Sequence, residues 1–167
     1  MAKNKKKRPI FNWKKFDVKI VELALAKARK KLDYYVDIPV YSIGKKLMSG
    51  NDGALVFYFT DENIYFYCIL IRRMQGIKEL FVRAHEWGHL VHFSGLSKEK
   101  IKCLGKCFKE PLDRKYTYLR FEYEKRAFKE AYKLMIEAKV PLRIRDLFVE
   151  YSTFNLSSVV KNELKIK

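Results

Sequence analysis

All three histidines of the chain lie in one ten-residue stretch, AHEWGHLVHF, at positions 84 to 93. His85 and His89 are four residues apart, so on an α-helix they project from the same face, one turn apart. Two imidazole nitrogens placed in this way can bind one zinc ion. The pattern predicts a metal site on a helix, and any imidazole chemistry of this chain must take place here.

Glu86 lies directly after the first histidine, on the adjacent face of such a helix. From that face it does not bind the metal itself but can reach a water molecule that the metal holds. Zinc lowers the pKa of its water to about 7, and a glutamate can then remove the proton as the water attacks a peptide carbonyl. Gly88 lets another backbone or a substrate strand come close. The motif therefore predicts zinc-dependent peptide hydrolysis with Glu86 as the general base.

The alternative is a chance occurrence of this motif on a buried helix. The sequence before the motif, however, predicts two strands, ALVFYFT at 54–60 and IYFYCILI at 64–71, joined by the short turn DEN. Both are rich in aromatic and β-branched residues, which is typical of a hairpin. A helix that directly follows strands is the context that a zinc-peptidase motif requires, and this context favours the catalytic interpretation.

A catalytic zinc site has a third protein ligand and an open position. No histidine follows His92, and the position six residues after His89, where long-motif zinc proteases place a third histidine, is Gly95. The third ligand should therefore be a carboxylate on a later helix. The sequence predicts such a helix from about residue 118 to residue 139.

Glu124 is the expected third ligand because it lies in the apolar stripe of that helix. The residues that share its face are Phe121, Ala127, Phe128 and Ala131. An ionised carboxylate among apolar side chains needs a partner, and zinc would supply one. An ion pair with a nearby Lys or Arg at the edge of the core is the alternative explanation. Glu122, on the basic and solvated face, is the alternative metal ligand, and Glu130 is a further candidate.

Other side chains near the motif are candidates for supporting roles. His92, nearly two turns after His85, is expected either to stand near the site and contact a ligand or the substrate, or to be a hydrogen-bonded histidine at the helix end. Tyr116, Tyr118 or Arg120 can supply the hydrogen-bond donor that stabilises a transition state opposite the metal. The sequence does not choose among these three.

The remaining segments predict a mixed α+β fold. A helical period runs from Asp17 to about Tyr34, the motif helix covers about 77–93, and a short amphipathic helix follows Pro141. The polar, Lys-rich segment 94–116 is expected to be a long connection or partial lid. The order is one helix, a small sheet and then a run of helices.

The composition indicates a globular chain of 167 residues, with a basic arm at 1–15 and a single domain at 16–167. No apolar run approaches the roughly 20 residues needed to span a bilayer, and the basic N-terminus lacks the apolar segment of a signal peptide. Three cysteines without zinc-finger spacing indicate reduced thiols. They are Cys68, Cys103 and Cys107. We expect a cytoplasmic protein without a membrane partner; the oligomeric state is not indicated.

The net charge of +17, from 36 Lys and Arg against 19 Asp and Glu, is the second unusual feature. Such a chain is attracted to polyanions, because neutralising phosphates releases counterions. The basic residues are spread along the sequence, apart from the run KNKKKR at 3–8, and no nucleic-acid-binding signature is present. The charge therefore predicts non-specific contact with nucleic acid through a basic surface.

With its elements in this order, the chain resembles the ImmA/IrrE-type zinc metallopeptidases of bacteria, phages and mobile elements. The resemblance rests on the strands, a following pair of arginines, and the stretches ELFVRAHEWGHLVHF and FEYEKRAFKEAYKLM, and it covers about residues 55–136. It matches His85, Glu86 and His89 to the family's zinc-and-base motif. Glu124 matches the glutamate of the family's second helix. The resemblance implies a small zincin-like α+β domain with one Zn²⁺ per chain, and members often cleave DNA-bound repressors.

The first hypothesis is therefore an intracellular zinc endopeptidase acting on a protein or peptide, such as a repressor or another nucleic-acid-associated protein of a phage or mobile element. It would be bacterial or phage-encoded, with packaging in a virion as one location. Its sheet edge would align an extended substrate by strand addition. The alternative is a basic nucleic-acid-associated or phage assembly protein with a non-catalytic zincin fold. The charge favours this alternative, whereas Glu86, which a structural zinc does not need, argues against it.

Overall fold

The protein was analysed as a computed structural model, which describes residues 38–44, 48, 52–60, 63–74, 76–109 and 117–163. The predicted basic arm at 1–15, the helix predicted from Asp17 and the candidate Tyr116 lie outside them.

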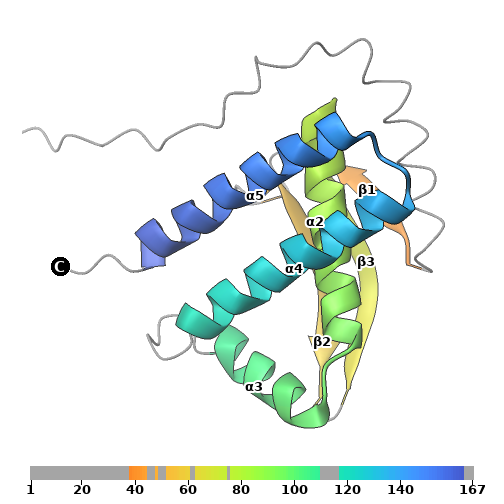
Figure 1. Ribbon diagram of the computed structural model, residues 1–167. Helices are drawn as coiled ribbons and strands as arrows, with labels where there is room; N and C mark the ends of the chain where they lie inside the picture. Colours follow the sequence, from red (N-terminus) through yellow and green to blue (C-terminus); the bar gives the residue numbers. More distant parts are fainter. Residues whose placement is uncertain are drawn as a thin grey trace, which may run out of the picture.

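The described part of the chain is a small sheet followed by a run of helices, which confirms the predicted α+β class (Figure 1). The elements in chain order are β1 Val40–Ile43, β2 Gly53–Phe59, β3 Ile64–Arg72, α2 Ile77–Ser94, α3 Lys98–Lys109, α4 Thr117–Glu137 and α5 Leu142–Glu163. No helix among them is both long and apolar enough to cross a membrane.

The sheet has the strand order β1-β3-β2. β2 and β3 form the predicted antiparallel hairpin, whereas β1 pairs with β3 in parallel. Because β3 is central, its inward side chains Ile69 and Ile71 are fully buried. β2 is an outer strand of the described sheet, with β3 on its inner side.

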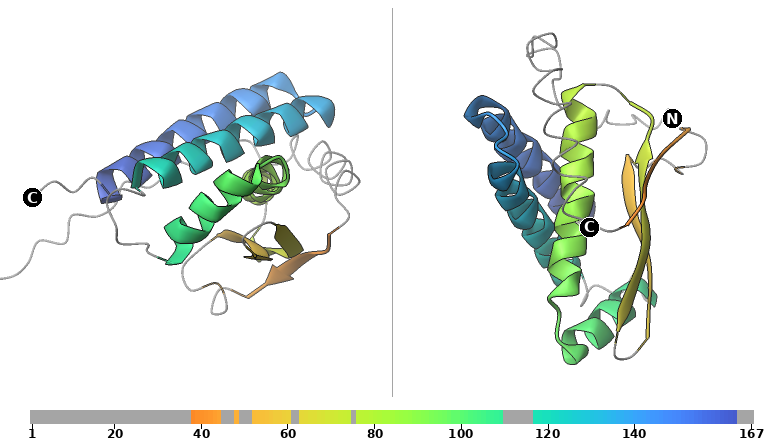
Figure 2. Two further views of the ribbon diagram at one scale, coloured as in Figure 1. Left: turned by 90° about the horizontal axis from the view of Figure 1, so that it is seen from below. Right: turned by 90° about the vertical axis from the view of Figure 1, so that its right-hand side faces the viewer.

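Helix α2 lies between the sheet and the pair α4 and α5 (Figure 2). One cluster of buried side chains joins these layers. It includes Ile69 of β3, Phe81 and Trp87 of α2, Ala131 of α4 and Phe148 of α5. Burial of such large apolar side chains is the main contribution to stability, and it fixes α2, which carries the motif, from both sides.

The backbones of α2 and α4 approach each other closely at Gly88. A Cβ atom there would lie 1.9 Å from the carbonyl oxygen of Ala127, so a side chain would push the two backbones apart. The glycine expected to admit another backbone therefore admits α4. Since Glu124 lies one turn before Ala127, this contact brings its carboxylate to the motif.

Two helices, α3 and α5, differ from the predictions. The segment 94–116, expected to be a connection or lid, contains α3, because Ile101, Leu104 and Cys107 form a buried face beneath its exposed lysines. Helix α5 continues to Glu163, far beyond the short amphipathic helix expected after Pro141.

Helices α4 and α5 lie side by side and run in opposite directions (Figure 1). The turn between them places Lys139 in the left-handed region, with φ of 56°, which a residue with a Cβ atom seldom adopts. The backbone N–H of Val140 donates to the carbonyl of Met135, and α5 begins two residues later. This short turn fixes where α5 lies against α4.

Candidate metal centre

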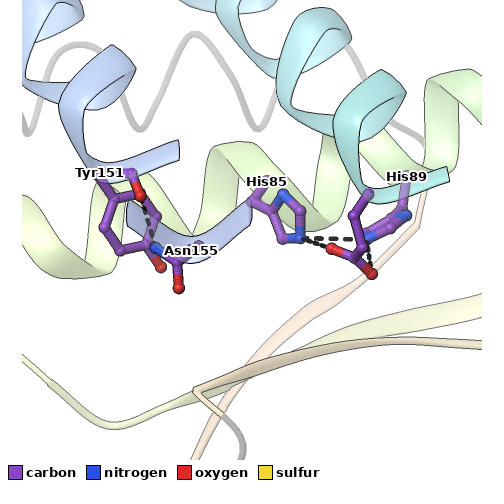
Figure 3. A network of polar contacts seen from close by, with 5 residues as sticks. His85, His89, Tyr151 and Asn155 are labelled. Atoms are coloured by element: carbon purple, nitrogen blue, oxygen red, sulfur yellow. Dashed lines mark hydrogen bonds and ion pairs between the residues drawn. The ribbon is translucent and has the colours of Figure 1, made fainter. Parts of the chain in front are cut away.

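The two motif histidines and Glu124 meet at one point, and Figure 3 shows how the side chains of His85 and His89 lie beside each other. The Nε2 atom of His85 lies 3.0 Å from Oε2 of Glu124, and Nε2 of His89 lies 3.4 Å from Oε1. The two Nε2 atoms are 3.1 Å apart. Within the described ranges, these residues form the one group of three or more His, Cys, Asp or Glu side chains whose ligand atoms lie within 4.8 Å of one another.

The spacing of these atoms fits a tetrahedral metal ion. Ligand atoms that each lie about 2.0–2.1 Å from such an ion are about 3.3–3.4 Å apart, and the three observed separations are between 3.0 and 3.4 Å. Two imidazoles and a carboxylate are also a ligand set that catalytic zinc uses. The same atoms permit a direct ion pair between His89 and Glu124 when the imidazole is protonated.

The electrostatics keep Glu124 negatively charged. Burial alone would raise the pKa of its carboxyl, but hydrogen bonds with His85 and His89 hold that pKa well below its usual value. Burial alone would likewise lower the pKa of His89, whereas its hydrogen bond with Glu124 raises it above the usual value. The site therefore presents an anion between two imidazoles, and a cation can balance that charge.

The two rings are held in place by their surroundings. The side chains of His85 and His89 are 13% and 12% exposed, and the ring of His85 packs on Phe128 at a centroid distance of 4.0 Å. The Nδ1 atom of each ring is buried and makes no hydrogen bond with a described residue. Nε2 is therefore the nitrogen that each ring turns to the shared point.

Glu86 lies beside this group rather than in it, as the helix geometry predicts for a general base. It is 8% exposed and packs against the start of β2, where a Cβ atom on Gly53 would lie 2.7 Å from Oε1 of Glu86. Burial raises the pKa of the Glu86 carboxyl; the nearby His85 and His89, and a hydrogen bond from the Leu55 backbone, counter this only in part. A raised pKa suits a carboxylate that must take up a proton.

Glu86 and the three converging residues all line one cleft with a volume of about 510 Å³. Its other walls come from β2, α2 and α5. The residues are Asp52, Gly53, Ala54, Leu55, Phe57, Val82, Phe93, Tyr151 and Asn155. The Leu55 backbone donates a hydrogen bond to Glu86, so β2 borders this cleft along the side that faces Glu86.

The alternative ligands lie elsewhere on α4. Glu122 pairs with Lys125 at 3.4 Å, and Glu130 pairs with Lys133 at 2.8 Å. Both are therefore i,i+3 surface pairs of the ordinary kind, and Glu124 is the α4 glutamate that the fold brings to the histidines.

His92 lies near the end of α2, but its buried Nε2 atom has no hydrogen-bond partner among the described residues, so this atom does not make the hydrogen bond expected for a helix-end histidine. Its ring lies 5.6 Å from that of Phe93 and 5.8 Å from that of Tyr123, and it lines neither of the two cavities beside the metal ligands. Burial and the nearby Arg126 lower its pKa to about 4. Tyr118, at 68% exposure, faces solvent, whereas Arg120 lines a second cavity next to His89.

Two cleft residues on α5, Tyr151 and Asn155, are absent from the sequence-based candidates. The side-chain amide of Asn155 donates to the backbone carbonyl of Tyr151 at 2.7 Å (Figure 3). Burial raises the pKa of the Tyr151 hydroxyl, which keeps it a neutral donor at pH 7. Ile144, Phe148 and Tyr151 follow one another at helical spacing, and all three are buried. This spacing is the sequence signal that could have indicated that Tyr151 points inward.

Comparisons of the chain with protein-family models, curated proteins and solved structures find no match. The resemblance to the ImmA/IrrE-type metallopeptidases therefore stays a prediction, and the case for function depends on the site itself.

Proposed function

We propose that this chain is a zinc-dependent endopeptidase with a zincin-like fold. His85, His89 and Glu124 would hold the ion, and Glu86 is the general base. The observation that carries the proposal is the convergence of two imidazoles and a carboxylate beside a buried glutamate, all on one cleft. A structural zinc would need the first three residues but not the fourth.

A zinc ion bound here would supply Lewis acidity, which activates water and polarises a peptide carbonyl. The chain's own residues would do the rest. Glu86 takes the proton of the attacking water and passes it to the leaving nitrogen. Its raised pKa favours the uptake of that proton, and its position against β2 keeps it at the wall of the cleft.

Tyr151 is the cleft's neutral hydrogen-bond donor on α5, and we assign it the stabilisation of negative charge that develops on the substrate carbonyl. Loss of a single donor of this kind typically lowers kcat by about 100-fold or more. Tyr151→Phe should therefore lower kcat by about that factor while zinc content stays at the wild-type level. Unchanged kcat would remove Tyr151 from the mechanism.

The outer edge of β2, which borders the cleft, is the feature that suits a polypeptide substrate. An extended peptide can add to such an edge through backbone hydrogen bonds, which would place its carbonyl groups along the cleft beside β2. Backbone pairing does not need a free chain end. This supports internal cleavage of a protein, with a repressor or another nucleic-acid-associated protein as the substrate that the resemblance implies.

The second candidate function is a basic nucleic-acid-associated or assembly protein without catalysis, and the net charge of +17 favours it. Both functions share a salt-dependent attraction to nucleic acid, so binding to DNA does not separate them. They differ in whether Glu86 has a role.

The test has two steps on purified, untagged protein. The first is zinc content by plasma mass spectrometry for wild type, Glu124→Ala and the matched control Glu130→Ala, which removes a glutamate of the same helix that pairs with Lys133. About one zinc per chain is expected in wild type and control, with loss in Glu124→Ala. No zinc in the wild type, even after zinc is offered, would end the proposal.

The second step compares wild type with Glu86→Gln on a proteome-derived peptide library read by mass spectrometry of new termini. Glu86→Gln should keep its zinc and lose cleavage, because the amide cannot accept the proton. Equal cleavage by both would refute the mechanism. Zinc without cleavage in the wild type, on peptides and on candidate DNA-bound repressors alike, would favour the non-catalytic alternative.

A further inference from the structure

A second cavity adjoins the candidate metal ligands, and neither Glu86 nor any residue of β2 lines it. Its volume is about 170 Å³, and it is formed where α2, α3, α4 and α5 meet. Its lining residues are His89, Phe93, Leu104, Cys107, Arg120, Tyr123, Glu124 and Val159. His89, Phe93 and Glu124 also line the cleft. The cleft and the second cavity therefore adjoin at two of the three candidate ligands.

The lining of this cavity is mostly apolar. Phe93, Leu104 and Cys107 are buried, and the Cys107 thiol stays protonated at neutral pH, since burial raises its pKa to about 11. An apolar cavity of about 150 Å³ is large enough to hold a benzene molecule. The second cavity therefore has room for a side chain of the size of leucine or phenylalanine.

The charged groups around the cavity restrict its occupant further. Glu124 is committed to the histidines, whereas the guanidinium of Arg120 is permanently positive. A lysine or arginine side chain would have to lose its hydration next to that charge. An apolar side chain meets no such cost and gains from leaving water.

We propose that this second cavity is the subsite for an apolar, leucine- or phenylalanine-sized side chain of the substrate residue next to the cleaved bond. The proposal rests on the proposed function, since it needs a substrate carbonyl at the three ligands. A substrate carbonyl at the three ligands places the neighbouring substrate residue beside the lining residues that the cleft and the second cavity share. The enzyme would then select its cleavage position by a large apolar residue and reject basic ones.

Hydroxamates, which bind zinc directly, provide probes that need no known substrate. One pair is leucine hydroxamate and glycine hydroxamate, which differ on the amino side of the zinc-binding group. The other is succinyl hydroxamate with and without an isobutyl substituent, which differ on the carboxyl side. Lysine hydroxamate tests the exclusion of basic side chains. Dissociation constants are measured by calorimetry on protein whose zinc content has been verified.

The expected result is that, in at least one pair, the leucine-like member binds about tenfold or more tightly than its partner, as for groups of this size in apolar pockets. Lysine hydroxamate should not bind more tightly than glycine hydroxamate. Val159→Trp, which fills the cavity from α5, should abolish the preference. Val160→Trp is the matched control, because Val160 is the next residue on the same helix and lines neither cavity.

A variant that enlarges the cavity covers the case in which Val159→Trp does not fold. Leu104→Ala should shift the preference from leucine hydroxamate towards phenylalanine hydroxamate, since it makes the cavity larger. Equal binding within both pairs on zinc-loaded protein, or a preference that survives Val159→Trp, would overturn the subsite and leave the metal site standing. No hydroxamate binding to protein that holds zinc would overturn the subsite and the proposed function together.

Discussion

Helix α2 packs against α4 at Gly88 and against β2 at Gly53. The two contacts differ in which atoms a side chain added to the glycine would strike. Towards α4, a Cβ atom on Gly88 would lie 1.9 Å from a backbone oxygen, that of Ala127. Towards β2, a Cβ atom on Gly53 would lie 2.6 Å from Cγ1 of Val82 and 2.7 Å from Oε1 of Glu86, which are side-chain atoms. The first contact joins two backbones, and the second joins a backbone to side chains.

This difference separates the two parts of the site. A backbone within a helix cannot move locally without moving the helix, whereas the end of a side chain can rotate. The contact at Gly88 therefore fixes the three candidate ligands relative to one another, because His85 and His89 are on one helix and Glu124 is on the other. The contact at Gly53 sets the position of Glu86, and this position can be changed on its own.

The largest expected effect comes from Gly88→Ala, which should separate α2 from α4. Forced overpacking between backbones is expected to destabilise the fold by about 3 kcal/mol or more, measured by urea denaturation, and to weaken zinc binding. Gly95→Ala is the control, since its nearest atom would be 3.8 Å away and its φ of −96° suits alanine; a change within about 0.5 kcal/mol is expected. Equal stability of the two variants would show that the contact at Gly88 is not a constraint.

Gly53→Ala should have a smaller and more selective effect. The fold loses about 1–2 kcal/mol, zinc content stays unchanged, and cleavage slows because Glu86 is displaced. Gly44→Ala is the control, because an added Cβ atom there has nothing within 4 Å. Zinc content by mass spectrometry and initial rates on one cleaved peptide are the measurements. Loss of zinc in Gly53→Ala would mean that the two contacts are not independent.

The smallest expected effect concerns His92, the motif-region histidine that belongs to neither contact. Its pKa is about 4 in the fold against 6.5 as the ordinary value, so the unfolded chain binds this proton more readily. Its contribution to stability is present above about pH 6.5 and is lost as the pH falls to about 4.

His92→Phe tests this by removing that part of the acid dependence. Compared with wild type, the variant should lose less stability between pH 6.5 and pH 4 in thermal denaturation, and its zinc content at pH 7 should be unchanged. Reduced zinc content would instead place His92 at the metal site.

The parts of the site that the sequence predicts are those where residue type and helical period coincide. The spacing of His85 and His89 places them on one face, and the apolar neighbours of Glu124 mark it as a carboxylate that points inward; the structure brings all three together. The hairpin is predictable for the same reason, since aromatic and β-branched residues fill both of its strands.

The remaining parts depend on tertiary contacts that leave weak local signals. β1 is only four residues long and pairs in parallel with β3, so no turn marks it. In α3, lysines on the exposed face hide the buried stripe of Ile101, Leu104 and Cys107. Tyr151 looks like any other core aromatic until the fold sets it against the cleft.

Helix α5 contributes to both cavities, with Tyr151 and Asn155 at the cleft and Val159 at the smaller space. These residues lie along about two turns of one helix, whose inclination is set by the four residues between α4 and α5, Lys139 among them. A substitution that tilts α5 therefore alters the position of Tyr151 in the cleft and the depth of the second cavity at once. If the proposed function holds, substitutions that move α5 would change the catalytic geometry of the cleft and the side-chain preference of the second cavity together. Substitutions in α3, whose residues line the second cavity and not the cleft, would change the preference alone.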